Sequence, residues 1–567
     1  MKRIAGFLCI TSFFVALGLN AQDIRNYNNN WVFGDSIHLK FSNIPNANQN
    51  PILNTAVSHN MVNSEGNASI SDGFGNLLFY AGHPSTNPAA FNLYDANYNL
   101  MPNGQNLVSH ESASQGIIIT KDPEDCSEYY VFYVSNTIGN GLRYSKVDMD
   151  LNGGMGDVIP GEKDILLYST RGEKVIIAQK ENSKYFWVIT RRIDPTAGPL
   201  DELVAIPLLA GGIFGAPVIS VFGVPAAATG TGYMSMHPDN LKLADVQYAN
   251  KSVCTYDFNP ATGGFTNRTT IYSSLSNMPY GGSYSPAGNV LYVTFQENDP
   301  GPNFGFEILR RFHLSVDPTG ATFTDVIVGL SDGFHAVQRS PKGLMYVTQG
   351  SSQFLHKIAD PDNYAAPNIT LNGQSVTRFV LGGLPNQYFP WESVQNYDFM
   401  NLSGSQEICF NTATTVGGPA DSLQAVYSWQ GQILTPSGWT TPSSSYLVNP
   451  NATNPTTINL TSGVTRFILT ILNDCGDTIF VNKELVYLDS LSVPVVTGDV
   501  DYCAGETITP LTSTPPIAGV INWYSDASLN TLVGTGTTYT PANIVGATTY
   551  FVVEQVTGGL VPQECTG

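Results

Sequence analysis

The sequence predicts an all-β protein in which a seven-bladed β-propeller, with a six-bladed one as the alternative, precedes two immunoglobulin-like β-sandwiches. Two apolar runs joined by a tight turn recur from residue 66 to residue 348, and a Cys, Trp, Cys series occurs twice beyond residue 400. In both regions apolar residues alternate with polar ones, which is the period of a strand and not of a helix. These observations define the predicted fold class.

The repeated phrase is clearest at residues 280–294 and 335–348, where a Ser-Pro turn separates two apolar runs. The residues just before the turn mark six copies: Ser71, Lys121, Lys180, His237, Ser285 and Ser340. These markers recur about every 54 residues, a period typical of propellers. Two strands cannot bury their faces alone, whereas four-stranded blades packed in a ring can. Glycines at several inner-strand starts agree with strands that converge on a central channel.

Strand-like segments outside the six copies predict a seventh blade. Residues 31–34 and 37–41 precede the copies, and residues 375–381 follow them. We expect these segments to combine, so that strands from both chain ends close the ring and remove exposed sheet edges. The predicted propeller domain is therefore residues 22–397.

The amino terminus has the pattern of a secretion signal. Lys2 and Arg3 precede an apolar run that ends in small residues at 19–21, which predicts cleavage before Gln22. No cysteine follows the run at the cleavage position, so a lipoprotein anchor is not expected. No later segment reaches the ~18 apolar residues of a membrane span. We expect a secreted protein on the extracellular surface.

The composition argues against nucleic acid as a partner. The formal net charge is −20 and charged residues make up only 12% of the chain. Binding to phosphates requires clustered lysine and arginine, and the sequence contains no such cluster.

Two sandwiches are predicted beyond the propeller, at residues 398–490 (immunoglobulin-like or PKD-like) and 491–567. Cys409, Trp429 and Cys475 recur as Cys503, Trp523 and Cys565 with the same spacing from the first Cys to the Trp. Such a series fits sandwiches whose disulfide crosses between sheets with the Trp packed on it. In an exported protein this predicts the bonds Cys409–Cys475 and Cys503–Cys565.

Two cysteines fall within the propeller. We expect Cys126 and Cys254 to be separate, partly buried thiols, although the sequence leaves a bond between them open.

Several segments resemble a known family. Residues 62–72 (Val-Asn-Ser-Glu-Gly-Asn-Ala-Ser-Ile-Ser-Asp), 75–80, 101–104 and 141–157 resemble the amino-terminal propeller of surface proteins that gliding bacteria export by the type IX secretion system. The resemblance covers roughly residues 28–396. Residues 522–524 and 549–552 resemble the immunoglobulin-like modules that follow such propellers.

The family also implies a carboxy-terminal sorting domain associated with gliding motility. The sequence ends at Gly567, just after Cys565. We therefore expect the natural chain to continue, with the export machinery as a partner of the missing domain.

One turn has a weak calcium pattern. The candidate ligands are Asp148, Asp150, Asn152 and Asp157. Ile159 occupies the position at which a calcium loop needs a bidentate Glu, so an ordinary glycine turn is the favoured interpretation. No other cofactor and no metal site are expected, because the histidines lack the close pairing of a zinc site.

The starts of the innermost strands supply the candidate ligand site. By the repeat alignment they place these side chains at one mouth of the channel: Glu65, Gln115, Lys174, Tyr280 and His335. Such a set lacks the motifs of a catalytic centre but could bind a small polar ligand such as a sugar.

Two functions remain after these exclusions. The favoured one is a non-catalytic adhesion protein whose propeller binds a glycan or a surface protein while the sandwiches form a spacer stalk. The alternative is a propeller enzyme, such as a lactonase or a polysaccharide lyase, on the same stalk. Fold alone does not decide between them.

Overall fold

The structure is a computed structural model. It describes residues 22–23, 26–42, 50–55, 61, 65–87, 89–135, 137, 140–169, 172–181, 183–192, 200–225, 230–275, 277–296, 307–328, 333–389, 406–409, 426–435, 438–440, 447–451, 456–457, 463–472, 475, 477–488, 495–496, 502, 506–514, 520–542 and 546–555. The predicted signal peptide lies outside these residues.

Contacts divide the chain into two units. The first comprises Met1–Phe399, Pro419–Val426 and Thr470–Phe480, and the second comprises Met400–Gly418, Tyr427–Leu469 and Val481–Gly567. The described residues form strands and contain no α-helix. The all-β prediction is therefore confirmed, while the predicted domain boundaries stay predictions.

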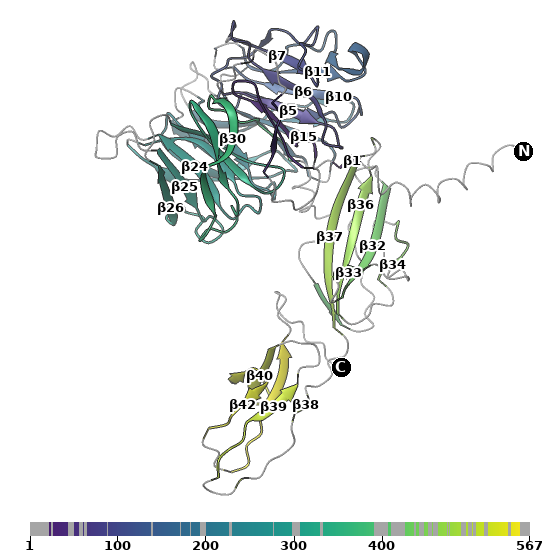
Figure 1. The fold of residues 1–567 in the computed structure, drawn as a ribbon, viewed down its shortest axis with the longest axis vertical. Coiled ribbons are helices and arrows are strands. Elements are labelled where there is room, and N and C mark those ends of the chain that lie inside the picture. Colours follow the sequence, from purple (N-terminus) through teal and green to yellow (C-terminus); the bar gives the residue numbers. More distant parts are fainter. Residues whose placement is uncertain are drawn as a thin grey trace, which may run out of the picture. The chain divides into compact units, whose positions relative to one another are not determined.

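Seven separate antiparallel sheets are present in the described part of the first unit (Figure 1). The first sheet comprises β2 (Asn30–Phe33), β3 (Ile37–Lys40) and β4 (Ile52–Leu53). The second comprises β5 (Ala68–Ser71), β6 (Leu77–Gly82), β7 (Ala90–Asp95) and β8 (Leu107–Val108). The third comprises β9 (Ile117–Lys121), β10 (Glu128–Tyr133), β11 (Leu142–Asp148), β12 (Asp157–Val158) and β13 (Ile165–Tyr168). The fourth sheet comprises β14 (Val175–Gln179), β15 (Phe186–Arg192), β16 (Leu200–Leu209), β17 (Ile213–Phe214) and β18 (Val218–Pro225). The fifth comprises β19 (Met234–Met236), β20 (Lys242–Gln247), β21 (Ser252–Phe258) and β22 (Phe265–Ser273), and the sixth comprises β23 (Met278–Tyr284), β24 (Leu291–Gln296), β25 (Glu307–Phe312) and β26 (Phe323–Val328). The seventh comprises β27 (Phe334–Arg339), β28 (Met345–Gln349), β29 (Ser352–Ile358) and β30 (Ile369–Val380).

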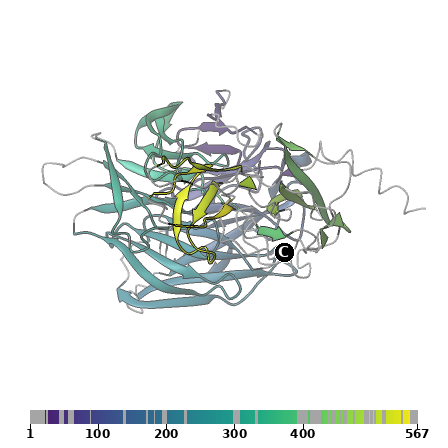
Figure 2. The same cartoon turned by 90° about the horizontal axis from the view of Figure 1, so that it is seen from below.

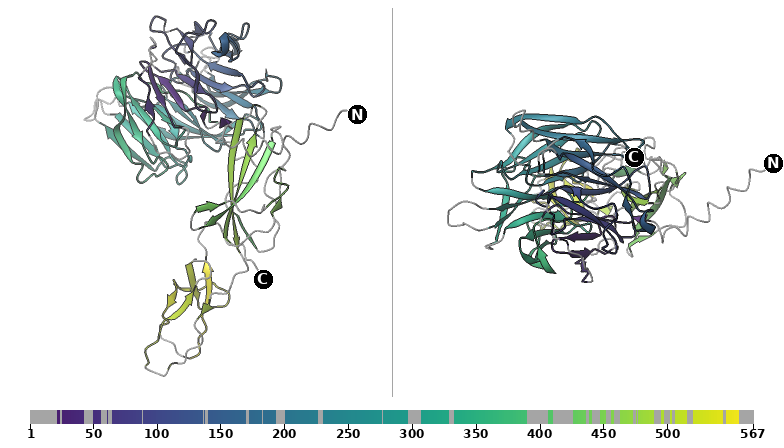
Figure 3. Two further views of the ribbon diagram at one scale, coloured as in Figure 1. Left: turned by 45° about the vertical axis from the view of Figure 1, so that its right-hand side comes forward. Right: turned by 90° about the horizontal axis from the view of Figure 1, so that it is seen from above.

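The sheets are arranged as a propeller. The first strands of successive sheets contact each other in the series β5, β9, β14, β19, β23 and β27. Seen along the channel, the colours pass around the unit from purple to green, so the first and last sheets lie side by side (Figures 2 and 3). The number of sheets agrees with the predicted number of blades, which stays a prediction.

The inner strands come close together at their starts. A Cβ on Gly66, just before β5, would lie 3.0 Å from the Ala113 carbonyl oxygen, just before β9, and one on Gly281 would clash with the His335 carbonyl oxygen. Larger residues at these two positions would push neighbouring inner strands apart.

A hydrophobic cluster closes the ring between the first and last sheets. Trp31 and Phe41 of the first sheet make edge-on contacts with each other at 4.9 Å, and Trp31 contacts Tyr346 of β28 at 5.8 Å. The other buried members include Phe33, Ile37, Leu39, Ala336, Leu355 and Val380. Because side chains from both chain ends share one core, neither end separates without exposing it to water.

The strands that close the ring differ from the predicted ones. Residues 375–380 belong to β30, the outer strand of the last sheet, and not to a sheet with residues 31–41. Gly382 instead accepts a backbone hydrogen bond from Ala336 of β27, and Pro385 forms a parallel bridge with Asn67 beside β5. The segment just after β30 therefore joins the last inner strand to the second sheet. The strand-like pattern of residues 375–381 could not reveal this, because apolar and polar residues alternate in the same way in an inner strand and in an outer strand.

The disulfide prediction for the first sandwich is wrong. Cys475 is bonded to Cys126, with an S–S distance of 2.08 Å and 349 residues between them. Both residues belong to the first unit. Cys475 is thus not available to Cys409, and Cys126 is not a thiol. The Cys503–Cys565 bond lies outside the described residues and stays a prediction.

The last propeller cysteine is a buried thiol. The Cys254 Sγ lies within a hydrophobic cluster, 3.8 Å from Thr270 Oγ1. It is fully and not partly buried.

Most of the residues in the strands of the predicted sandwiches belong to the second unit. The strands β32 (Val426–Thr435), β33 (Gly438–Thr440), β36 (Gly463–Leu472) and β37 (Asp477–Leu488) follow the order β37-β36-β32-β33, and β31 (Gln406–Cys409) pairs with β37. Two three-stranded sheets follow: β38 (Val495–Val496), β39 (Leu511–Thr514) and β42 (Thr538–Tyr539), and β40 (Val520–Tyr524), β41 (Leu532–Thr535) and β43 (Phe551–Gln555). Trp523 is fully buried, and its indole donates to the Gly536 carbonyl at 2.8 Å.

Within the described residues, the structure contains no helix of the length and apolar character that a membrane crossing requires.

Candidate functional site

The amino-terminal mouth of the channel is the end at which the inner strands begin. There the Tyr280 hydroxyl of β23 donates a hydrogen bond to the Glu65 carboxylate, which lies just before β5. The His335 ring of β27 meets the Tyr280 ring edge-on, with 5.3 Å between centroids. Three predicted site residues from three sheets therefore come together.

A second carboxylate belongs to the same mouth. Glu173, just before β14, accepts hydrogen bonds from Thr231 Oγ1 at 3.0 Å and from Ser114 Oγ at 3.4 Å. Burial raises the pKa of Glu173, although the Thr231 hydrogen bond opposes this rise. Burial also raises the pKa of Glu65 to about 7, and the nearby charges of Glu173 and Glu111 act in the same direction. The mouth thus holds a carboxyl group that changes its charge near neutral pH.

Aromatic rings surround these carboxylates. Tyr233 and Tyr248 each lie 5.9 Å from the Tyr280 ring, between centroids. Tyr233 and Tyr280 are buried, whereas Tyr248, His335 and Glu65 remain partly exposed. Burial, with the Glu65 charge next, raises the pKa of Tyr280 well above its ordinary value. Its hydroxyl therefore keeps its proton and serves as the donor to Glu65.

Gln115 and Lys174 lie just before β9 and β14, at the same mouth, but their side chains point away from Glu65, Tyr280 and His335. The Gln115 amide spans the channel, donating to the Met234 carbonyl at 3.0 Å and accepting from the Met234 amide at 2.9 Å. The Lys174 amine is buried and donates to Asp245 Oδ1 at 2.6 Å and to the Val246 carbonyl at 2.9 Å. Neither side chain is grouped with Glu65, Tyr280 and His335.

Lys174 instead belongs to a buried cluster of charges. Arg191 of β15 also forms an ion pair with Asp245, and the Gln247 amide donates to the same carboxylate at 2.8 Å. Burial acts to raise the pKa of Asp245, but the charges of Arg191 and Lys174 outweigh it and hold this pKa below its usual value. Burial lowers the pKa of Lys174. The cluster joins the sheets of β14 and β19 and has a structural role.

Sequence reasoning missed Glu173, Tyr233 and Tyr248. Glu173 precedes the chosen Lys174 by one residue, and Tyr233 follows a glycine at the start of β19. The repeat alignment located the mouth, but it could not decide which of two adjacent side chains faces the channel. That choice depends on strand twist and on the starting residue of each strand.

The raised pKa of Glu65 predicts a pH dependence of stability. Between about pH 4.5 and 7, the folded protein keeps a proton on Glu65 that the unfolded chain has released. The free energy of unfolding should therefore fall as the pH rises through this window. Glu65→Gln should flatten that fall, as measured by denaturant unfolding across the window. Glu181→Gln is the control, because Glu181 is an exposed glutamate of the same propeller, and an unchanged slope in Glu65→Gln would contradict the assignment.

The candidate calcium turn is built on glycines. Gly153 and Gly154 have φ angles of 66° and 86°, and a Cβ on either would face open space. Asp148 accepts the backbone N–H of Asp150 at 2.8 Å, and Asp157 accepts that of Asn103 at 2.8 Å. Asn152 begins the short 3₁₀ turn. Across the described residues, no group of three or more His, Cys, Asp or Glu side chains is placed to hold a metal ion.

Comparison with known proteins gives a match at the carboxy-terminal end. The family model described as "Ig-like domain CHU_C associated" matches residues 492–566. A search of curated proteins by sequence gave no significant match.

Solved structures similar to this chain include one that is described as a propeller. A protein from Lactobacillus plantarum is 10% identical, covers 63% of this chain and 98% of its own, and has a TM-score of 0.42. The Dos1 propeller is 13% identical, covers 54% of this chain and 70% of its own, and has a TM-score of 0.34. A gluconolactonase from Xanthomonas campestris is 11% identical, covers 50% of this chain and 82% of its own, and has a TM-score of 0.29. At these identities the likenesses say nothing about activity.

The fold and the family match agree on the arrangement of the chain. Radially arranged antiparallel sheets come first, and the matched domain follows at residues 492–566. This protein therefore combines a β-propeller with an immunoglobulin-like module, the arrangement of the type IX secretion surface proteins that its sequence resembles.

Proposed function

We propose that this is a secreted, non-catalytic surface protein whose propeller binds a glycan at its amino-terminal mouth, with the immunoglobulin-like modules as a spacer stalk. The secretion signal pattern and the immunoglobulin-like match support the surface location.

The hydrogen bond from Tyr280 to Glu65 carries this proposal. It fixes a carboxylate at the rim of the channel, next to the partly exposed rings of Tyr248 and His335. A sugar needs an aromatic face on which to stack and fixed polar partners for its hydroxyl groups, and this mouth supplies both. Tyr280 itself is buried, so it positions Glu65 and does not stack on the ligand.

Binding should weaken when this arrangement is removed. We expect the double variant Tyr280→Phe, His335→Ala to bind its glycan more weakly by on the order of 1–3 kcal/mol, the range for losing buried polar partners. A glycan array with the wild-type chain identifies the ligand, and calorimetry measures the loss. Tyr144→Phe is the matched control, because Tyr144 donates to Glu162 at 2.8 Å in another part of the propeller. Normal glycan binding by the double variant would refute the assignment.

The same carboxyl group favours a second candidate function. A group with a pKa of about 7 beside a tyrosine and a histidine could transfer protons, as a lactonase or a polysaccharide lyase requires. Incubation with the glycan found on the array separates the two candidates. Release of shortened or unsaturated products that stops in Glu65→Gln would favour the enzyme over the binding protein.

A further inference from the structure

Three carboxylates gather at the amino-terminal mouth of the channel. Glu65 and Glu111 are partly exposed there, and Glu173 is buried. The turn that carries Glu111 packs against the start of β5, because a Cβ on Gly66 would lie 3.0 Å from the Ala113 carbonyl oxygen. Among the described residues, the two charges that act on the Glu65 carboxyl group, those of Glu173 and Glu111, are both negative. A partly open mouth lined by one sign of charge attracts the opposite sign.

We infer that the glycan unit bound at this mouth carries a primary ammonium group, as an amino sugar does, and that this group pairs with the Glu65 carboxylate. The inference rests on the proposed function and names the class of sugar. Glu65 already accepts the Tyr280 hydroxyl, but a carboxylate has further lone pairs for an ammonium N–H. A hydrogen bond between two charged groups is stronger than one between neutral groups, so the amine adds affinity that a neutral sugar lacks.

A buried hydroxyl group at the mouth supports a ligand with several donors. Tyr233 is 3% exposed, and its hydroxyl oxygen has no hydrogen-bond partner among the described residues. Burial, with the Glu65 charge next, raises the pKa of Tyr233, so its hydroxyl group keeps its proton and lies within the field of Glu65. Buried polar groups without a partner are rare in proteins. A primary ammonium group has three N–H donors, so one that binds Glu65 keeps donors for this oxygen.

The mouth admits the ammonium group without admitting the whole sugar. This group is about the size of a water molecule, and the ring that carries it stays at the rim. There Tyr248 and His335 are partly exposed, and Tyr248 lies 5.9 Å from the Tyr280 ring between centroids. Aromatic rings pack against the apolar face of a sugar, and they also attract a nearby cation. The rim therefore suits the ring of an amino sugar and the interior suits its amine.

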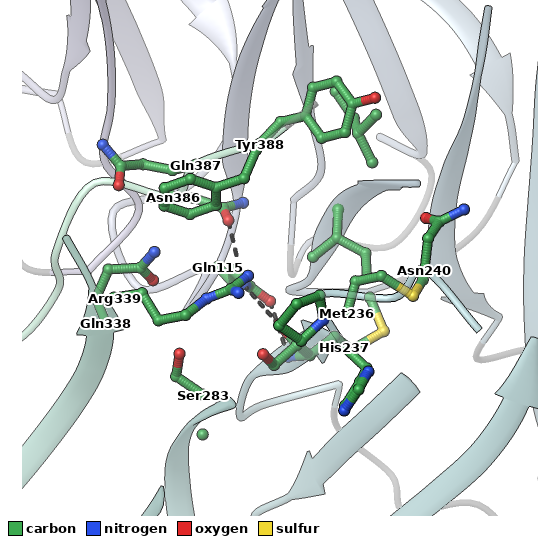
Figure 4. Close-up of a pocket in the computed structure, with 17 residues that line it drawn as sticks. Gln115, Met236, His237, Asn240, Ser283, Gln338, Arg339, Asn386, Gln387 and Tyr388 are labelled. Carbon is green, nitrogen blue, oxygen red and sulfur yellow. Dashed lines mark hydrogen bonds between the residues drawn. The ribbon is translucent and has the colours of Figure 1, made fainter. Parts of the chain in front are cut away.

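The opposite, carboxyl-terminal mouth does not offer a second site of this kind. A cavity opens there with a volume for water-sized solvent of ≈ 50 Å³ (Figure 4), which by that measure holds roughly four water molecules and no sugar ring. Arg339 lines this cavity, with its guanidinium group 4.9 Å from the Phe389 ring centroid, and its charge opposes a cation. The Gln115 amide donates to Asn386 Oδ1 at 3.2 Å in a layer between the two mouths (Figure 4).

Calorimetry with hexosamines tests the inference on the full secreted chain. The probes are D-glucosamine, D-galactosamine and D-mannosamine, each compared with its N-acetyl derivative and its parent hexose, and chitotriose compared with its N-acetylated form. At least one amine should bind about tenfold more tightly than its acetylated and parent forms, because these lack the charge. Equal binding of every amine and its N-acetyl form would overturn the inference.

Glu65→Gln should abolish the preference for the amine, because it removes the charge and keeps an oxygen that can accept the Tyr280 hydroxyl. Glu181→Gln is the matched control, since Glu181 is an exposed glutamate of the same propeller. Two further variants keep the test decisive if Glu65→Gln does not fold. Glu111→Gln should weaken amine binding severalfold. Tyr233→Phe should also weaken it without lowering the free energy of unfolding, because its hydroxyl oxygen loses no partner within the described residues.

The pH dependence of binding gives a readout that a merely structural role would not change. Burial, assisted by the charges of Glu173 and Glu111, raises the pKa of Glu65 to about 7. The amine stays protonated below this pH, whereas Glu65 gains its charge only as the pH rises. Affinity for the amine should therefore increase by about tenfold to fiftyfold from about pH 5 to about pH 7, in proportion to the ionised fraction.

Glu65→Gln separates this effect from the other titratable groups of the mouth. These groups are Glu111, Glu173, Tyr233, Tyr248, Tyr280 and His335, with Lys174 paired to Asp245 behind them. All of them remain in the variant, so a flat profile in Glu65→Gln assigns the pH dependence to Glu65. An unchanged profile in that variant would overturn the pairing of the amine with Glu65.

The outcomes distinguish this inference from the proposed function. Binding of a neutral glycan that is lost in the Tyr280→Phe, His335→Ala variant, with no preference for an amine, would overturn the inference and leave the proposed function standing. Absence of binding to every sugar, charged or neutral, would overturn both. A lysine-containing peptide that binds as tightly as the best amino sugar would assign the mouth to a protein partner and would also overturn the inference.

Discussion

A mature chain that lacks residues 22–45 is expected to lose the cooperative unfolding transition of the propeller. The deletion removes five large side chains that are almost fully buried: Trp31, Phe33, Ile37, Leu39 and Phe41. Loss of each such side chain from a core costs about 2–5 kcal/mol. Together they amount to about 10–25 kcal/mol, which matches or exceeds the roughly 5–15 kcal/mol that stabilises a typical domain. Differential scanning calorimetry should show no propeller transition.

Two point variants separate this effect from a general defect of the shortened chain. Trp31→Ala removes a ring that contacts Tyr346 of the last sheet, and it should lower the free energy of unfolding by about 3–5 kcal/mol. Ile52→Ala lies in the same sheet but is 74% exposed and should have little effect. A deletion variant that melts at the wild-type temperature would show that the amino-terminal sheet does not close the ring.

Asp245→Asn should destabilise the propeller by about 3–5 kcal/mol, because it leaves Lys174 and Arg191 buried without their shared carboxylate. Lys174 and Asp245 are at most 1% exposed. Water therefore cannot reach the site to solvate the cations after the carboxylate charge is removed. Denaturant unfolding of the two proteins gives the difference in free energy.

Asp257→Asn is the matched control on the neighbouring strand. Asp257 pairs with Lys242 at 2.7 Å, but both side chains are about half exposed. Exposed pairs contribute about 0–1 kcal/mol, so this variant should be nearly neutral. Equal losses for the two variants would mean that burial does not set the strength of the Asp245 cluster. The double variant Asp245→Asn, Lys174→Met should recover part of the loss, because it removes one of the two stranded cations.

The sequence located the candidate site but could not choose all of its members. The repeat alignment brought Glu65, Tyr280 and His335 to one mouth of the channel, and the structure places these three in contact. The same alignment could not see that Lys174 is directed to Asp245. A one-residue shift at a strand start sends a side chain to the opposite face, and a repeat of uneven length does not fix that shift.

The cavity around Arg339 carried no sequence signal. Its lining comes from the inner strands β14, β19, β23 and β27 and from the segment after β30. Residues this far apart in the chain converge only when the ring forms. From the sequence alone, the glutamine, asparagine and serine residues of this lining cannot be distinguished from the many surface residues of the same types.

The sequence by itself determined the all-β class, the repeated sheets and the two kinds of module. Strand alternation, turn residues and the repeat period are local properties, and hydrophobic burial selects the fold that satisfies them together.

Only the tertiary structure decided the connections between distant segments. Cys475 pairs with Cys126 and not with Cys409, and the segment from Gly382 to Asn386, not residues 375–381, joins the ring. Local pattern specifies that a strand forms or that a cysteine is present, whereas the partner depends on which segments lie within bonding distance after the sheets have packed.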